Sequence, residues 1–296
     1  MTPEFVQFIT PDKLTLPGLL FQPPRAHAVM IHLHGNGSSS VFYEQNYDFA
    51  QTLYKNGVAL LMFNNRGAHL VKKINVEKNG EVERKLFGMA YEKIKECVED
   101  IDGAVSFLEK KGFKTFYLAG ESTGANKICV YNYYKSNNKI AKYILIAGGD
   151  DTGIYYDMLG KDKFNKLLKK SQEKIKNKKG EEMIAELLPD EFFSYQGFYD
   201  ITNPDGDYNV FPFYEVINKV KLSTKPFFRH YKSINKPTLV VYGEKDEYAW
   251  GNVQRVVDIL KKQQPKFEYK IIPDADHGFH GKEKDLAQTI VTWLKK

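Results

Sequence analysis

The sequence predicts an α/β protein with a mostly parallel central sheet, flanked by helices and interrupted by one helical insertion. Short continuous apolar runs alternate with amphipathic helical patterns, as expected for strands buried on both faces of a parallel sheet. This alternation stops near residue 152 and resumes near residue 232. We therefore predict a core of residues 1–151 and 232–296, with a cap formed by residues 152–231.

The core elements are expected in the following order. Glu4 to Thr10 and Leu14 to Gln22 form an opening hairpin, and residues 70–87 form a surface excursion with a hairpin turn at Asn79-Gly80. Further strands are predicted at 28–33, 58–63, 115–119, 140–147, 236–243 and 267–272. Helices are predicted at 43–55, 91–111, 125–136, 251–262 and 282–295.

The insertion lacks this alternation. A basic helical pattern covers residues 164–175, and a second helix is expected from Met183 to Leu188. An aromatic-rich stretch follows. Its side chains are expected either to form the hydrophobic core of the cap or to line a substrate-binding site. Because ligands of parallel sheets bind at the carboxyl ends of the strands, we expect the cap to lie over those ends.

Composition excludes several classes of function. The net charge of +6 comes almost entirely from scattered Lys, which lacks the forked geometry that suits phosphate and base recognition, so no nucleic-acid partner is expected. No run of about 18 apolar residues and no signal peptide is visible, so we expect a cytoplasmic protein without a membrane partner. Cys97 and Cys129 show no metal or redox spacing and are expected as reduced core residues. No metal set and no cofactor motif appears.

One motif carries chemistry. Residues 120–124 read Gly-Glu-Ser-Thr-Gly, between a predicted strand and a predicted helix. This is the form of a nucleophile elbow, a turn so tight that its serine takes strained backbone angles and its flanking positions require glycine. Ser122 is therefore the candidate nucleophile.

An acid and a base follow Ser122 at the ends of later predicted strands. Asp246 comes 124 residues after Ser122, and His277 comes 31 residues after Asp246. Imidazole can accept the serine proton near neutral pH, and a carboxylate on its other nitrogen fixes the tautomer. Glu244, Glu247, Asp150 and Asp151 are rival acids.

His280 is the rival to His277 as the base. His34 is expected to order its loop, His32 to be a hydrogen-bonded core group, and Arg66 to tie down its own loop.

With these residues in place, the chain resembles the α/β-hydrolase superfamily over nearly its whole length, and within it serine esterases with a cap after the sixth strand. The resemblance implies an oxyanion hole formed by the backbone N–H groups of Asn36, in the His34-Gly-Asn-Gly37 loop, and Thr123.

The expected function is hydrolysis of a small-molecule carboxylic ester through an acyl-enzyme. A peptidase, thioesterase or acyltransferase would use the same residues. A non-catalytic ligand-binding protein is the alternative from another class.

Overall fold

The computed structural model describes residues 1–41, 46–185 and 191–296. An eight-stranded sheet runs through the molecule in the order β1-β2-β4-β3-β7-β8-β9-β10. All pairs from β4 to β10 are parallel, and β2 is antiparallel to both of its neighbours. The strands are β1 Glu4–Ile9, β2 Thr15–Phe21, β3 Ala28–Leu33, β4 Ala59–Phe63, β7 Thr115–Glu121, β8 Ile140–Ile146, β9 Thr238–Gly243 and β10 Glu268–Ile272. The predicted mostly parallel α/β sheet is confirmed.

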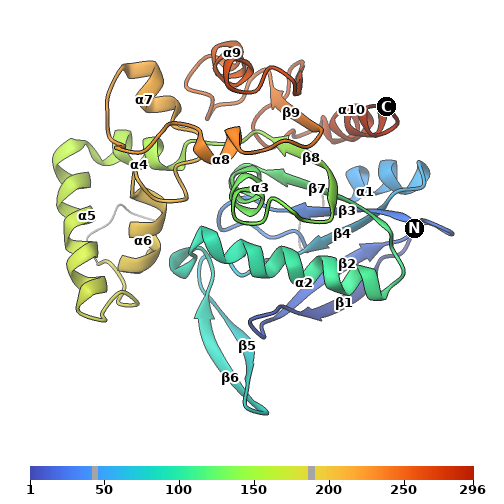
Figure 1. Ribbon diagram of the computed structural model, residues 1–296, viewed down its shortest axis with the longest axis horizontal. Coiled ribbons are helices and arrows are strands. Elements are labelled where there is room, and N and C mark those ends of the chain that lie inside the picture. Colours follow the sequence, from blue (N-terminus) through green and yellow to red (C-terminus); the bar gives the residue numbers. More distant parts are fainter. Residues whose placement is uncertain (42–45, 186–190) are drawn as a thin grey trace.

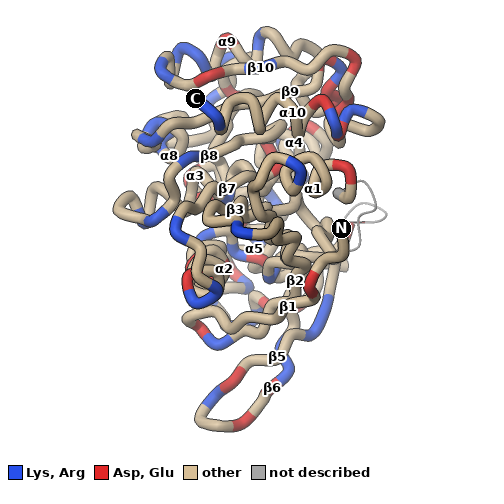
Figure 2. Tube along the Cα trace, turned by 90° about the vertical axis from the view of Figure 1, so that its right-hand side faces the viewer, with Lys and Arg blue, Asp and Glu red and all other residues tan. Residues whose placement is uncertain are grey.

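Helices cover both faces of this sheet. On one face α2 packs against α3, and on the other α1 packs against α10, as Figures 1 and 2 show together. Strands β3, β4 and β9 are almost wholly buried, which explains why their sequences are continuous apolar runs. The core helices are α1 Asn46–Lys55, α2 Cys97–Lys110, α3 Thr123–Tyr134, α9 Val253–Gln263 and α10 Glu283–Leu294.

Between the neighbouring strands β8 and β9 the chain forms a separate group of helices, seen to the left of the sheet in Figure 1. They are α4 Asp151–Leu159, α5 Lys161–Lys176, α6 Tyr195–Thr202, α7 Phe213–Asn218 and α8 Arg229–Lys232. The insertion follows the sixth strand of the main sheet. Its treatment as a cap of residues 152–231 stays a prediction.

Two predicted helices differ from the structure. The helix expected from residue 91 begins at Cys97, because residues 89–91 and 94–96 form short 3₁₀ turns and the Ile94 N–H donates to Asp200 Oδ2 at 2.7 Å. The helix expected from Met183 is absent at that residue, which forms an antiparallel bridge with Ser194. The rest of that predicted helix, residues 186–188, lies outside the described residues, as do residues 43–45 of the first predicted helix.

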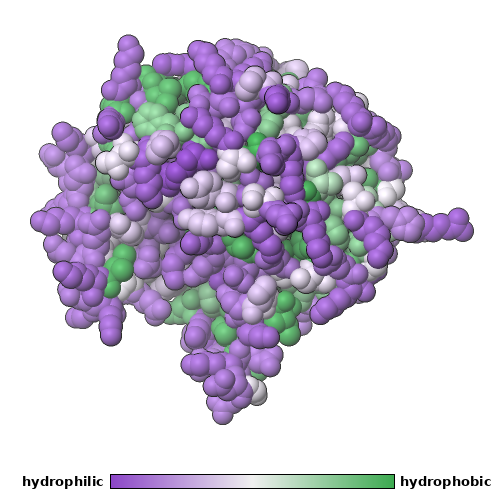
Figure 3. All heavy atoms as spheres, viewed as in Figure 1, coloured by the Kyte–Doolittle hydropathy of each residue, from purple (hydrophilic) through white to green (hydrophobic). Residues whose placement is uncertain are grey.

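A second hairpin stands away from the body of the molecule. Strands β5 Lys72–Lys78 and β6 Glu81–Phe87 pair around the Asn79-Gly80 turn, as the sequence predicted, and project downward in Figures 1 and 3. The face shown in Figure 3 is mostly hydrophilic, with small separate hydrophobic patches. Cys97 and Cys129 are buried and free, as expected. Across the described ranges, no helix has the length and apolar character needed to span a membrane.

Candidate active site

Ser122 lies in the turn between β7 and α3. Its backbone angles are φ 53° and ψ −126°, a conformation that a non-glycine residue adopts only under strain. The Ser122 N–H donates to the Ile146 carbonyl of β8 at 2.9 Å, which anchors the turn to the neighbouring strand. The strained serine thus sits at the carboxyl end of a central strand, as a nucleophile elbow requires.

The two glycines of the motif are required by close backbone approach. A Cβ on Gly120 would lie 2.4 Å from the Gly124 carbonyl oxygen, and a Cβ on Gly124 would lie 2.3 Å from the Leu33 carbonyl oxygen. Both separations are far below a normal contact, and both neighbours are main chain, so neither can rotate away. The elbow therefore depends on these glycines for its geometry.

We expect Gly124→Ala to lower the free energy of unfolding by about 3 kcal/mol, because the added methyl group overpacks the backbone of β3. Gly149→Ala is the matched control: its Cβ would meet no atom within 4 Å, so its effect should stay below about 1 kcal/mol. Urea denaturation of both variants measures the difference. Equal stability of the two variants would contradict the packing account of the elbow.

His277 and Asp246 meet in the loops that follow β10 and β9. His277 Nδ1 lies 2.9 Å from Asp246 Oδ1, and the Asp246 side chain is 1% exposed. The Tyr248 N–H also donates to Asp246 Oδ1 at 2.9 Å, which holds the carboxylate in place. Because the carboxylate accepts the Nδ1 proton, Nε2 is left as the nitrogen that can accept a proton.

Two opposing effects set the pKa of His277. Burial alone would lower this pKa, but the hydrogen bond to Asp246 and the charges of Asp246, Glu247 and Glu121 outweigh burial and raise it above 6.5. The imidazole is therefore a stronger base than a free histidine side chain.

The rival acids hold other positions. Glu244 accepts from the Asp274 N–H, and Asp150 caps α4 through the Gly153 N–H. Asp151 accepts from Thr123 Oγ1 at 3.2 Å and from Asn126 Nδ2 at 3.3 Å. None of these three forms a hydrogen bond or ion pair with His277 among the residues that the structure describes. Glu247, the fourth rival, accepts from the backbone N–H of His277 at 3.1 Å and not from its ring.

The rival base, His280, lines the same cavity but pairs with a different acid. His280 pairs with Asp276 at 2.7 Å on the surface, where both side chains are exposed. Its hydrogen-bonding partner therefore belongs to its own loop, four residues earlier. The geometry brings Asp246 and His277 together and leaves His280 apart from that pair.

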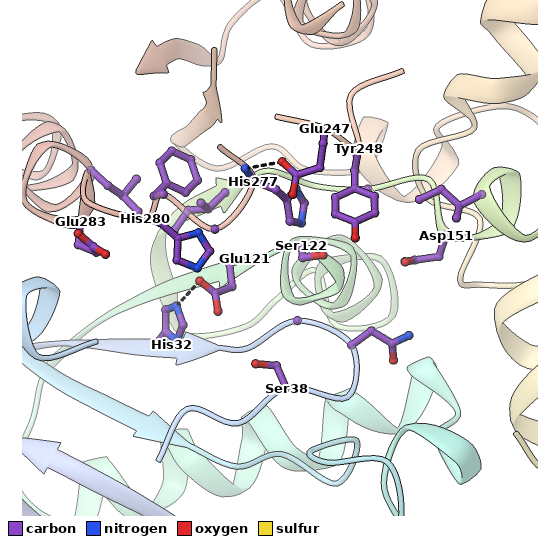
Figure 4. Close-up of a pocket in the computed structure, with 18 of the residues that line it drawn as sticks. His32, Ser38, Glu121, Ser122, Asp151, Glu247, Tyr248, His277, His280 and Glu283 are labelled. Atoms are coloured by element: carbon purple, nitrogen blue, oxygen red, sulfur yellow. Dashed lines mark hydrogen bonds and ion pairs between the residues drawn. The ribbon is translucent and has the colours of Figure 1, made fainter. Parts of the chain in front are cut away.

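Ser122 and His277 face one cavity of about 590 Å³ at the carboxyl ends of the strands. Figure 4 shows Ser122 at its centre, with His277 and Tyr248 above and the loop that carries Ser38 below. No hydrogen bond to the Ser122 hydroxyl is present in the described part of the chain; in free enzymes such contacts often tighten only when substrate binds. The volume is in the range of small-molecule sites.

Asn36 and Thr123 flank the serine. The loop after β3 presses on it so closely that a Cβ on Gly35 would lie 3.0 Å from Ser122 Cβ. Thr123 is the first residue of α3, where backbone N–H groups have no partner within the helix. Within residues 1–41, 46–185 and 191–296, neither the Asn36 nor the Thr123 N–H donates to another protein group. Both donors are thus free beside Ser122.

A buried polar network lies beneath the elbow helix. Lys127 Nζ is 2.6 Å from Glu92 Oε1, and their side chains are 1% and 3% exposed. Lys127 also donates to Asn65 Oδ1, and His34 Nε2 accepts from the Asn65 N–H. His34 therefore ties its loop to the loop after β4, in agreement with its expected ordering role.

Arg66 is buried nearby, on the loop after β4. It bonds to Asp100, Glu96 and Asp12, as expected for a residue that ties down its loop. The Asp100 side chain is itself 1% exposed, so the pair forms a buried ionic anchor.

Several cavity residues were missed by sequence reasoning. These are Glu121, Tyr248 and Glu283, which line the cavity together with Glu247, a rival acid already expected from the sequence. Glu121 alone carried a signal, because it occupies the variable position before the nucleophile. His32 was expected in the core; it is buried, but it also lines the cavity, with Nε2 3.8 Å from Glu121 Oε2.

These features define the α/β-hydrolase fold: the order of the sheet strands, the elbow at Ser122, and the loops after β9 and β10 that bring Asp246 and His277 together. Solved structures agree over the full length of the chain. Est1E from Butyrivibrio proteoclasticus with bound ferulic acid has a TM-score of 0.65 at 15% identity, covering 98% of each chain.

Two further structures give the same result. The α/β hydrolase GrgF from Penicillium sp. sh18 has a TM-score of 0.64 at 15% identity, covering 100% of this chain and 98% of its own. An esterase from Pyrococcus furiosus has a TM-score of 0.60 at 16% identity, covering 99% and 90%. At these identities the likeness establishes the fold.

The chain belongs to the family described as protein of unknown function DUF1749, which matches residues 85–295. The matched range contains Ser122, Asp246 and His277, together with the insertion between β8 and β9, but not Asn36. No curated protein matches the chain.

Proposed function

We propose that the protein is a serine hydrolase that cleaves a carboxylic ester. One observation carries this proposal: the strained Ser122 faces the same cavity as the His277 imidazole. The Nδ1 atom of that imidazole is hydrogen-bonded to the buried carboxylate of Asp246. A serine hydroxyl becomes an effective nucleophile only when a base can take its proton. In the same cavity, His277 Nε2 is the ring nitrogen that the Asp246 hydrogen bond leaves available. The esterases of similar fold support the choice of an ester bond.

In the proposed reaction Ser122 Oγ attacks the ester carbonyl while His277 Nε2 takes its proton. Asp246 stabilises the resulting imidazolium through the Nδ1 hydrogen bond. The developing oxyanion is held by the free N–H groups of Asn36 and Thr123. His277 then protonates the leaving alcohol, and a water molecule, activated by the same nitrogen, releases the acid and restores Ser122.

We also propose that residues 152–231 act as a cap that selects the substrate. The cavity that Ser122 and His277 face is also lined by four residues of this segment, Ile154, Tyr155, Met158 and Glu191. The segment joins two adjacent strands, so its sequence can change without altering the strand order. The cap thereby accounts for substrate choice separately from catalysis.

A fluorophosphonate probe tests the proposal directly, since it reacts covalently with activated serines. We expect the folded protein to be labelled on Ser122 and to hydrolyse a short-chain p-nitrophenyl ester. Mass spectrometry of the labelled peptide identifies the modified residue. Failure of the folded protein to react, with no ester turnover, would exclude the proposed function and support a ligand-binding role.

The pH dependence of kcat/KM should report His277. Because only neutral imidazole accepts the serine proton, and its pKa lies above 6.5, activity should rise with pH through a value above 6.5 and be low below about pH 6. Asp246→Asn should shift this rise to lower pH and reduce kcat by about 10³- to 10⁴-fold.

The matched control for this measurement is Asp276→Asn, which removes the partner of the exposed His280. Asp276→Asn should leave the pH dependence of kcat/KM unchanged. A flat wild-type profile between about pH 5 and 8 would exclude His277 as the base.

A further inference from the structure

The walls of the cavity carry an excess of negative charge. Five acidic residues line it: Glu121, Asp151, Glu191, Glu247 and Glu283. No Lys or Arg stands among the described lining residues, although the chain contains 43 of them and has a net charge of +6. A cavity of opposite charge to the rest of the protein attracts cations and repels anions.

Four of these carboxylates accept hydrogen bonds from uncharged donors. Asp151 accepts from Thr123 and Asn126, Glu191 from the Tyr155 hydroxyl, Glu247 from the His277 N–H and Glu283 from the Gly281 N–H. Burial raises the pKa of Asp151 to about 6, so this group remains mostly ionised at neutral pH. The hydrogen bonds hold the carboxylates in place without cancelling their charge.

Glu121 is the carboxylate nearest to the reaction in the sequence. It precedes Ser122, and Figure 4 shows its side chain beside Ser122, between His32 and His280. Its only described ion-pair contact is His32 Nε2 at 3.8 Å, and burial lowers the pKa of His32, so that ring is neutral. In the described part of the protein no Lys or Arg pairs with Glu121, although its charge contributes to the raised pKa of His277.

Two further features of the cavity favour an organic cation. Asn36 Oδ1 is a buried oxygen on the cavity wall that has no hydrogen-bond partner among the described residues, so it can accept from an N–H of a ligand. Tyr155 and Tyr248 add aromatic rings, which attract cations over their faces. In the described ranges no group of three or more His, Cys, Asp or Glu side chains could hold a metal ion.

We propose that the substrate carries an alkylammonium group close to its scissile ester, and that Glu121 binds this group. The inference rests on the proposed function and narrows it to cationic esters. The ammonium occupies the side of the cavity lined by Glu121, while the ester carbonyl lies over Ser122. Esters with a carboxylate or phosphate near the carbonyl are excluded by repulsion.

Binding can be tested without catalysis. In a ligand-observed NMR titration at neutral pH, butylammonium should bind about tenfold more tightly than butan-1-ol, which has the same chain without the charge. Glu121→Gln should reduce this ratio to about threefold or less. Glu109→Gln, which removes an equal charge from a surface pair with Lys139, should leave the ratio unchanged. Equal binding of the two probes to the wild-type protein would overturn the inference.

Matched esters then show which part of the substrate carries the charge. For the acyl side, methyl 6-aminohexanoate is compared with methyl heptanoate. For the alcohol side, acetylcholine is compared with 3,3-dimethylbutyl acetate. We expect the cationic member of one pair to have a kcat/KM at least about tenfold higher, equivalent to about 1.4 kcal/mol, with Glu121→Gln lowering that preference.

The outcomes separate this inference from the proposed function. Hydrolysis of the neutral esters with no preference for a cation in either pair retains the ester hydrolase and rejects the cationic substrate. Preferential butylammonium binding by a protein that no fluorophosphonate labels retains the cation site and rejects the hydrolase. A wild-type preference that Glu121→Gln leaves intact would reject Glu121 as the binding group.

Discussion

Replacing Ser122 by alanine should lower kcat for ester hydrolysis by about 10⁵- to 10⁶-fold while leaving the protein folded. Alanine keeps the Cβ that contacts the Gly35 loop and removes only the hydroxyl. Without that oxygen no acyl-enzyme can form, so residual activity would reflect water attack in a cavity that still holds the free N–H donors. Single-turnover kinetics with a p-nitrophenyl ester measures the loss of activity. Thermal denaturation shows whether the variant is folded.

Ser38→Ala is the matched control, because Ser38 lines the same cavity on the opposite wall. Its hydroxyl has no place in the proposed reaction, so its loss should cost less than about tenfold. Wild-type turnover in Ser122→Ala, or an equal loss in both variants, would remove Ser122 from the mechanism.

Replacing Lys127 by methionine should lower the free energy of unfolding by about 3–5 kcal/mol. The change leaves the carboxylate of Glu92, 3% exposed, without its cation in the interior. Methionine has a similar length and fills the space, so the loss reports the uncompensated charge. Urea denaturation followed by circular dichroism measures the effect.

Lys139→Met is its control on the surface, where Lys139 pairs with Glu109 and both side chains are largely accessible. That change should cost at most about 1 kcal/mol. The double variant Lys127→Met with Glu92→Leu should regain much of the lost stability, since both charges then leave the interior. A double variant less stable than Lys127→Met alone would contradict the explanation.

Features set by local pattern were predicted well from the sequence. The buried parallel strands, the Asn79-Gly80 hairpin and the strand–turn–helix around Ser122 each follow from short runs of residues, and the structure confirms the fold that they imply. The order of Ser122, Asp246 and His277 also placed three side chains at strand ends. Their roles in catalysis remain proposals.

Features set by distant contacts could not be predicted. Helical periodicity continued back to residue 91, but Glu92 turns inward to Lys127, and Asp200 accepts from the Ile94 N–H, so the helix begins later. No pattern in the sequence relates Ile94 to Asp200, which lies 106 positions later. The acidic cavity is a similar case, because its five carboxylates come from five separate segments of the chain.

The position of His277 has a consequence for the newly synthesised chain. Ser122 follows the central strand β7, whereas Asp246 and His277 follow β9 and β10, which are synthesised after the other six strands of the main sheet. Six strands of the main sheet can therefore be assembled around an inert serine. In the proposed mechanism the hydroxyl gains its base only when β10 pairs with β9 at the sheet edge, so a chain that stops before β10 should contain Ser122 but hydrolyse no ester.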